Sequence, residues 1–262
     1  MSKVPSLTLW GTGGDPAGSV QVDIELSDPW SPEALEAVTK RIEAFVEAGA
    51  HGGYPSVGVP PASSQLSALG APVQTDDVLS VQLDATSVDY RAYQYLRHMV
   101  ANLDFGSAEP RHIRVRELGA TGLATRTAMP LVTFDNEDSA YPQPPPSPAR
   151  GFQVDWPDTD PSKFRVVLVE FTGTLVRADF TALAGPVEAW GALVEANAFS
   201  LPEAFPDEVD CLAGQTVMFD RYTAQIEVPR FIGSEAAWDC LLCLLDAFSA
   251  RGGRPIARVT VE

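Results

Sequence analysis

The sequence is poor in cysteine and in long apolar runs, and each shortage narrows the class of protein. Of the 262 residues only three are cysteines, Cys211, Cys240 and Cys243. An odd, low count does not make the disulfide framework of a small secreted protein, so a reducing cytoplasm is the expected compartment. No apolar run approaches the roughly 18 residues that a membrane-spanning helix needs, and the first residues lack the apolar core of a secretory signal. We therefore expect a cytoplasmic protein with no membrane partner.

Basic residues are scarce as well. The chain carries 18 Lys and Arg residues against 35 Asp and Glu residues, a formal net charge of −17. A charge of this sign repels the phosphates of DNA, RNA and anionic lipids, so nucleic acids and membranes are not expected partners. The rest of the composition, 45% hydrophobic and 20% charged residues, is typical of a globular chain. A chain of this length can bury a core without a metal or a disulfide.

Segments that resemble cofactor-binding or metal-binding motifs lack the flanking structure that those sites need, and motifs for nucleophilic catalysis are absent. Gly11–Gly14 is glycine-rich, but a strand-like segment follows it rather than the helix that a phosphate-binding loop opens. Cys240 and Cys243 form a C-x-x-C inside an apolar helical stretch, whereas a redox pair opens a helix and zinc needs four ligands. No paired-histidine metal motif and no G-x-S-x-G turn is present. We expect no cofactor, no metal and no catalytic residue, and the two cysteines in core positions.

Three segments of the first half of the chain return, in the same order, in the second half. Val22–Leu26 resembles Val167–Phe171, Phe45–Ala50 resembles Leu193–Ala198, and Val81–Asp84 resembles Ala224–Glu227. The displacement along the chain is nearly the same for the three pairs and differs only by a few positions, as short gaps in loops would allow. One such match could arise by chance, but three in one order indicate a duplicated unit.

Each unit begins with a strand and a helix. Apolar and polar residues alternate over Gln21–Leu26, which predicts a strand with one buried face. Ser31 is a good N-cap, and Pro32 suits the first position of the helix that follows. Gly49 is expected to end this helix in the left-handed conformation, with Asn197 in the matching place of the second unit.

The second half of each unit repeats the pattern. A strand at Leu79–Asp84 leads to Asp89, an expected N-cap, and a strand at Tyr222–Val228 leads to a helix with Trp238 as its expected buried anchor. The apolar stripes of the two helices have the same spacing, over Tyr93, Leu96, Val100 and Leu103 and over Trp238, Leu241, Leu245 and Phe248. A further strand follows each helix. The order is therefore β-α-β-β-α-β, twice, as in the split βαβ or ferredoxin-like arrangement.

We therefore predict an α+β fold of two tandem ferredoxin-like (βαββαβ) repeats that form a pseudo-dimer, joined by a Pro-rich connector. The predicted boundaries are residues 1–118, 119–164 and 165–262. In this topology the first and fourth strands are neighbours, which would place Asp23 and Glu25 opposite Arg114 and Arg116. In the second repeat Val166 and Leu168 fall on the solvent side. The connector, which contains the apolar run Met129–Phe134 and the Pro-rich stretch Pro142–Pro148, is expected to cover them.

Carboxylates are the main excess in the sequence, and they gather with aromatic residues in two loops. These candidate partner-binding residues are Glu203, Phe205, Asp207, Glu208 and Asp210 in one loop and Asp135, Glu137, Asp138 and Tyr141 in the other. Such loops can simply be solvated. They also suit recognition of a basic protein, because charge steers the encounter and aromatic side chains supply buried area.

Two functions remain open on this basis. The first is a non-enzymatic protein-binding protein, a bacterial immunity protein or antitoxin that occludes the active surface of a basic toxin. The second is a small-molecule-binding protein or enzyme that uses the crevice between the two halves, with His51, His98 and Asp84 as candidate residues. The sequence leaves the partner's identity and the oligomeric state undetermined.

Overall fold

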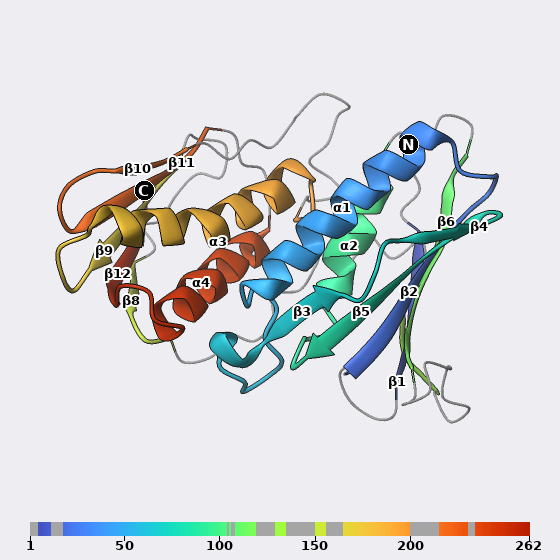
Figure 1. Cartoon of the computed structure of the whole chain (residues 1–262), viewed down its shortest axis with the longest axis horizontal. Helices are drawn as coiled ribbons and strands as arrows, with labels where there is room; N and C mark the ends of the chain where they lie inside the picture. Colours follow the sequence, from blue (N-terminus) through green and yellow to red (C-terminus); the bar gives the residue numbers. More distant parts are fainter. Residues whose placement is uncertain are drawn as a thin grey trace.

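The computed structural model describes residues 5–11, 18–103, 105, 108–118, 129–134, 150–155, 165–199, 215–229 and 234–262. These residues form a mixed α+β fold with two β-sheets and four α-helices, which confirms the predicted fold class at that level (Figure 1). The first part contains β1 (Ser6–Gly11), β2 (Gly18–Leu26), α1 (Pro32–Ala50), the short 3-10 helix η1 (Pro61–Ser63), β3 (Gln65–Ala68), β4 (Val73–Thr75), β5 (Val78–Thr86), α2 (Ala92–Ala101), β6 (Pro110–Glu117) and β7 (Met129–Phe134). The second part contains β8 (Gln153–Asp155), β9 (Arg165–Phe171), α3 (Arg177–Glu195), β10 (Thr216–Met218), β11 (Thr223–Val228), α4 (Glu235–Ala250) and β12 (Ile256–Val261).

The two sheets have the same strand order at their centres. The first runs β3-β5-β2-β6-β1-β7, with β4 also paired to β5, and the second runs β10-β11-β9-β12-β8. In each sheet the strand that precedes the first helix lies between the two strands that flank the second helix, and it is antiparallel to both of them. This is the order that the split βαβ arrangement requires.

The strand register corrects the alignment of the two halves. Val22 pairs with Val81 and Val167 pairs with Ile226, so one displacement along the chain relates both members of the first pair to those of the second. The same displacement relates the starts of α1 and α3, and each of these helices has 19 residues. Two of the three sequence matches were therefore wrong by a few positions. Phe45 corresponds in place to Trp190, not to Leu193, and Val81 corresponds to Ile226, not to Ala224.

The ends of α1 confirm one predicted cap and overturn the other. The side-chain oxygen of Ser31 accepts a hydrogen bond of 3.1 Å from the backbone N–H of Ala34, as expected of an N-cap. Gly49, however, lies inside the helix, where a Cβ atom would sit 2.5 Å from the Cβ of Leu66. Its small size lets β3 approach the helix. The left-handed residue is Gly52, at φ 87°, which corresponds to Asn197 at φ 57°.

The helices lie between the two sheets and contact one another across a seam that joins the two halves (Figure 1). Helix α1 packs against α3, and α4 packs against η1. The aromatic rings of Tyr95 and Phe199 meet across this seam with their centroids 4.9 Å apart. The Arg251 guanidinium donates hydrogen bonds of 2.6–3.0 Å to three backbone carbonyls of the first half, those of Ala50, Ala62 and Ser64. The seam is therefore both packed and hydrogen-bonded.

The buried faces of α2 and α4 differ from those predicted from the sequence. All ten residues of α2 are buried, rather than one stripe, because the helix has neighbours on several sides. Trp238, the predicted anchor of α4, is only partly buried. The fully buried tryptophan is Trp190 of α3, whose indole N–H donates a 2.8 Å hydrogen bond to the carbonyl of Ala237. The sequence had therefore placed the anchor of the second half on the wrong helix.

The charge pairing predicted for the first sheet is confirmed. Arg114 forms a 2.6 Å ion pair with Glu25, and Arg116 forms one with Asp23. Asp23 is 4% exposed, and its carboxylate also accepts a 2.7 Å hydrogen bond from the hydroxyl of Ser80. These pairs fix β2 between β5 and β6 on the sheet face that lies away from the helices.

Two strands that the predicted βαββαβ order does not include extend the first sheet. The first sheet gains β1, a strand not predicted from the sequence, which pairs with β6 and with β7. The run Met129–Phe134 is β7 itself, so it belongs to the first sheet and the expectation that it covers Val166 and Leu168 was wrong. The stretch 142–148 lies outside the described residues, and the predicted domain boundaries stay a prediction. No helix in the described part of the chain is long and apolar enough to cross a membrane.

Candidate functional site

The residues predicted from the sequence do not come together in a described site. All nine partner-binding candidates lie outside the described residues, namely Asp135, Glu137, Asp138, Tyr141, Glu203, Phe205, Asp207, Glu208 and Asp210. Of the three crevice candidates, His98 is buried within α2, at 4% exposure. Asp84 is exposed on β5, on the face that alternates with the buried residues Leu83 and Ala85. Only His51, at the C-terminal end of α1, lines a hollow at the seam.

The exposed side of the α1–α3 pair is rich in carboxylates, and we call it the α1–α3 face. Its exposed glutamates are Glu33, Glu36, Glu43 and Glu47 of α1 and Glu188 and Glu195 of α3. Lys40, the half-buried Arg41 and Arg177 are the basic residues on this side of the two helices. Lys40 is paired with Glu36 at 2.7 Å, and Glu47 lies 3.2 Å from the Nε2 atom of His51. On this side of α1 and α3, exposed carboxylates therefore outnumber cations by six to three.

One hollow on this face, the Glu195 hollow, has a volume of about 510 Å³. It is lined by Glu33, Glu36, Ala37, Lys40, Arg41, Ala44, Leu103, Ala192 and Glu195. Its rim is charged and its floor is made of small and apolar side chains. Burial lowers the pKa of the Arg41 guanidinium from its ordinary value, and the nearby Glu195 carboxylate acts in the opposite direction.

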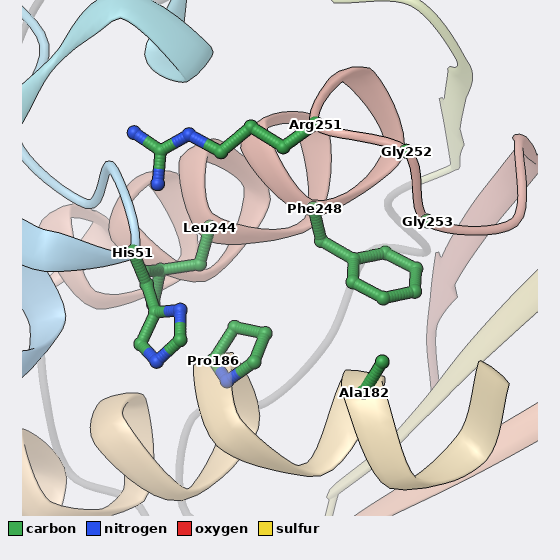
Figure 2. Close-up of a pocket in the computed structure, with 8 residues that line it drawn as sticks. All are labelled: His51, Ala182, Pro186, Leu244, Phe248, Arg251, Gly252 and Gly253. Atoms are coloured by element: carbon green, nitrogen blue, oxygen red, sulfur yellow. The ribbon is translucent and has the colours of Figure 1, made fainter. Parts of the chain in front are cut away.

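A second hollow, the His51 hollow, has a volume of about 260 Å³ and lies at the other end of α1. Leu244 and Phe248 of α4 face Ala182 and Pro186 of α3 across it, and the His51 ring lies at one end (Figure 2). Arg251, Gly252 and Gly253 complete the lining. The Arg251 guanidinium points away from Phe248 in Figure 2, toward the three carbonyls that it binds. Most of the side chains that line it are therefore apolar, and the imidazole is the polar side chain that faces them.

The two hollows occupy matching places in the two halves. Ala37 and Leu103 line the Glu195 hollow. Ala182 and Phe248, the residues that the strand register matches to them, line the His51 hollow. Arg41 and Pro186 are related by the same displacement. The places are alike but the chemistry is not, because the charged rim of one hollow is replaced by proline and phenylalanine in the other.

Cys240 and Cys243 behave as core residues, as predicted. Both are buried in α4, and burial raises the pKa of each thiol, that of Cys243 to about 12. A thiol with so high a pKa is protonated at neutral pH and is a poor nucleophile or metal ligand. Within the described ranges, no group of three or more His, Cys, Asp or Glu side chains could hold a metal ion. The third cysteine, Cys211, lies outside those ranges.

The α1–α3 face was not predicted from the sequence, although its signal is present. The spacing of Glu36, Glu43 and Glu47 places these residues on one side of a helix, and Glu188 and Glu195 are two helical turns apart. The apolar stripe of α1 indicates which side of the helix is buried, and these glutamates lie outside that stripe. That α3 would lie beside α1 does not follow from either helix alone.

Comparisons with known proteins give no family for this chain. No family model matches it, and no curated protein matches it. Among solved structures, a dye-decolorizing peroxidase from Bacteroides thetaiotaomicron aligns over 95% of both chains with 9% identity and a TM-score of 0.25. A protease from Helicobacter pylori aligns over 96% of this chain and 79% of its own, with 8% identity and a TM-score of 0.23. Likenesses at these TM-scores carry no argument about fold or function.

Proposed function

We propose that this protein is a non-enzymatic, acidic protein-binding protein of the immunity type, which neutralises a basic toxin in the cytoplasm by occluding the toxin's active surface. The observation that carries the proposal is the α1–α3 face, where six glutamates are exposed and three of them, Glu33, Glu36 and Glu195, line a hollow together with small and apolar side chains. Complementary charge speeds the encounter of two proteins, and apolar contact at the centre of an interface supplies most of its affinity.

The position of the carboxylates supports this use. Glu33, Glu43, Glu188 and Glu195 have no ion-pair partner among the described residues. They stand on two helices that pack against each other, so their spacing is held by the fold rather than by a loop. A basic surface that covered them would find carboxylates ready to pair, with little ordering cost. The acidic residues of segments 135–141 and 203–210 stay proposed partner-binding residues.

We also propose that the fold arose by duplication, as two tandem ferredoxin-like repeats that form a pseudo-dimer joined by a Pro-rich connector. The common strand order, the displacement shared by the first strand, first helix and third strand of each half, and the matching places of the two hollows support it. In this account the α1–α3 face is formed by equivalent helices of the two repeats. The proposed binding surface would then be a product of the duplication, because one repeat alone supplies half of it.

A capture experiment with matched variants tests the proposed function. The face variant replaces Glu33, Glu188 and Glu195 with Gln. The control variant replaces three exposed carboxylates elsewhere, Asp76→Asn, Asp84→Asn and Glu262→Gln, so both lose the same charge. Each immobilised protein is exposed to extract of the source organism, and captured proteins are quantified by mass spectrometry.

We expect the wild-type and control proteins to retain one cationic protein, and the face variant to retain at least about tenfold less of it. The captured protein should arrest growth when expressed alone, and co-expression of the wild-type chain should restore growth. Equal capture by the face and control variants, or a captured protein without toxicity, would contradict the proposal.

A second candidate function, small-molecule binding between the two halves, is favoured by one observation: His51 lines an apolar hollow at the seam. The chemistry of that hollow determines which ligand it suits.

A further inference from the structure

The walls of the His51 hollow are preformed by close packing. A Cβ atom on Gly253 would lie 2.6 Å from the ring of Phe248, and a Cβ atom on Gly185 would lie 3.3 Å from the ring of His51. Both aromatic rings therefore rest directly on glycine and have little space to move on that side. Opposite Phe248, the ring of Pro186 is rigid. A flat apolar molecule between these walls would gain contact area without ordering mobile side chains.

The imidazole of His51 gives the hollow one directional polar group. Its Nε2 atom lies 3.2 Å from a carboxylate oxygen of Glu47. When the ring is neutral, Nε2–H donates to this carboxylate, and Nδ1 carries a lone pair that can accept a hydrogen bond. In the described part of the structure Nδ1 has no hydrogen-bond partner. The pairing with Glu47 thus orients the ring, and it favours a ligand that donates a hydrogen bond to Nδ1.

The charge and size of the hollow narrow the ligand further. Arg251 donates to three backbone carbonyls, and its guanidinium points away from Phe248, so it is not aimed at a ligand between the apolar walls. The net charge of −17 also disfavours an anion. A volume of about 260 Å³ is below the roughly 300–1,000 Å³ of sites for drug-sized ligands. We propose that the His51 hollow binds a small, neutral aromatic molecule with one N–H or O–H donor, of the indole or phenol class.

The proposed ligand lies with its ring against Phe248, Leu244 and Pro186 and donates its hydrogen to Nδ1 of His51. This site goes beyond partner binding and does not depend on it, because the Glu195 hollow, with its charged rim, is a separate cavity. The ligand would also bridge α3 and α4 of the second half and the end of α1 of the first, so it would stabilise the seam.

The experiment titrates the full chain with indole and, separately, with 1-methylindole, which keeps the ring and lacks the donor. Binding is followed by calorimetry and by backbone amide shifts. We expect saturable binding of indole at one site and binding of 1-methylindole about tenfold weaker, the size of one hydrogen bond. In His51→Leu the two molecules should bind equally, because the acceptor is gone.

Two further variants test the location. Ala182 is exposed on α3 at the edge of the hollow, so Ala182→Phe should fill it and weaken indole binding by at least about tenfold without disturbing the core. Ala37→Phe places the same side chain at the matching position of the Glu195 hollow and should leave indole affinity within about twofold. No saturable indole binding by the wild-type chain, equal losses in the two Phe variants, or an unchanged preference for indole in His51→Leu would each overturn the proposal.

Discussion

The two hollows at the seam occupy the same place in the two halves but carry opposite chemistry. One is rimmed by Glu33, Glu195 and Arg41, and the other is walled by Pro186 and Phe248. The framework around them is alike, since α1 and α3 have the same length and β2 and β5 pair in the same register as β9 and β11. The comparison shows that the architecture fixes where a cavity forms, whereas a few side chains decide what it can hold.

The hydrophobic core allows a second comparison of the two halves. Phe45 of the first half and Trp190 of the second occupy matching positions, and both side chains are fully buried. We expect Trp190→Ala and Phe45→Ala each to lower the free energy of unfolding by about 3–5 kcal/mol, as large cavities do. Trp238→Ala should cost less, about 1–3 kcal/mol, because this side chain is only partly buried. Urea denaturation measures all three. A larger loss for Trp238→Ala than for Trp190→Ala would reverse the assignment of the core.

Gly49 and Val194 are a matched pair that tests why the halves differ. A Cβ atom at Gly49 would meet Leu66 of β3 at 2.5 Å, whereas the matching residue is a buried valine. Gly49→Ala should therefore destabilise the protein by about 1–3 kcal/mol, although alanine favours a helix. Leu66→Gly removes the Cβ atom that the new side chain would meet. Adding Gly49→Ala to the Leu66→Gly variant should therefore cost less stability than adding it to the wild-type chain. A stabilising effect of Gly49→Ala would show that β3 does not press on the helix.

The smallest expected effect is a pH dependence of stability that arises from His112 of β6. It lies opposite Glu25 in the sheet, where the second half has Arg258 opposite Glu170. Burial lowers the pKa of the His112 imidazole, and Arg114 adds to this effect while Glu25 opposes it. The folded state therefore resists protonation of this ring.

Because the unfolded chain takes up this proton more readily, stability should fall as the pH drops below the ordinary histidine pKa, and level off below the folded pKa. Screening at this half-exposed site keeps the effect below about 0.5 kcal/mol. Unfolding curves between pH 7.5 and pH 5.5 for the wild-type chain and for His112→Gln measure it. If acidification destabilised His112→Gln more than the wild type, the assigned direction of the His112 pKa shift would be contradicted.

Period-two alternation and helical periodicity were enough to predict the α+β class, the four helices and the ion pairs between Asp23, Glu25 and their arginines. They were not enough for the ends and neighbours of helices. Gly49 was predicted to end the helix because glycine often occupies that position. The close approach of Leu66 explains why a glycine instead lies inside α1. Strand β1 was missed because it is short and is stabilised by pairing with β6 and β7, which lie far from it along the chain.

The candidate site was harder to predict than the fold. The sequence singled out acidic loops, since dense charge is easy to see along a chain, whereas the glutamates of α1 and α3 are spread over both halves. His51 was named, but with two residues that the fold places elsewhere. Which side chains share a cavity depends on the packing of α1, α3 and α4, and helix periodicity does not encode the partner of each face.

The central claim is that the α1–α3 face binds a basic protein through its carboxylates. Its most direct test is the salt dependence of the dissociation constant for the captured partner, measured for the wild-type chain and for the variant with Gln at positions 33, 188 and 195. We predict that the wild-type affinity falls steeply between about 50 and 300 mM salt, and that the variant is weaker and much less sensitive to salt. Wild-type affinity that does not change with salt, or an equal slope in the variant, would contradict the account.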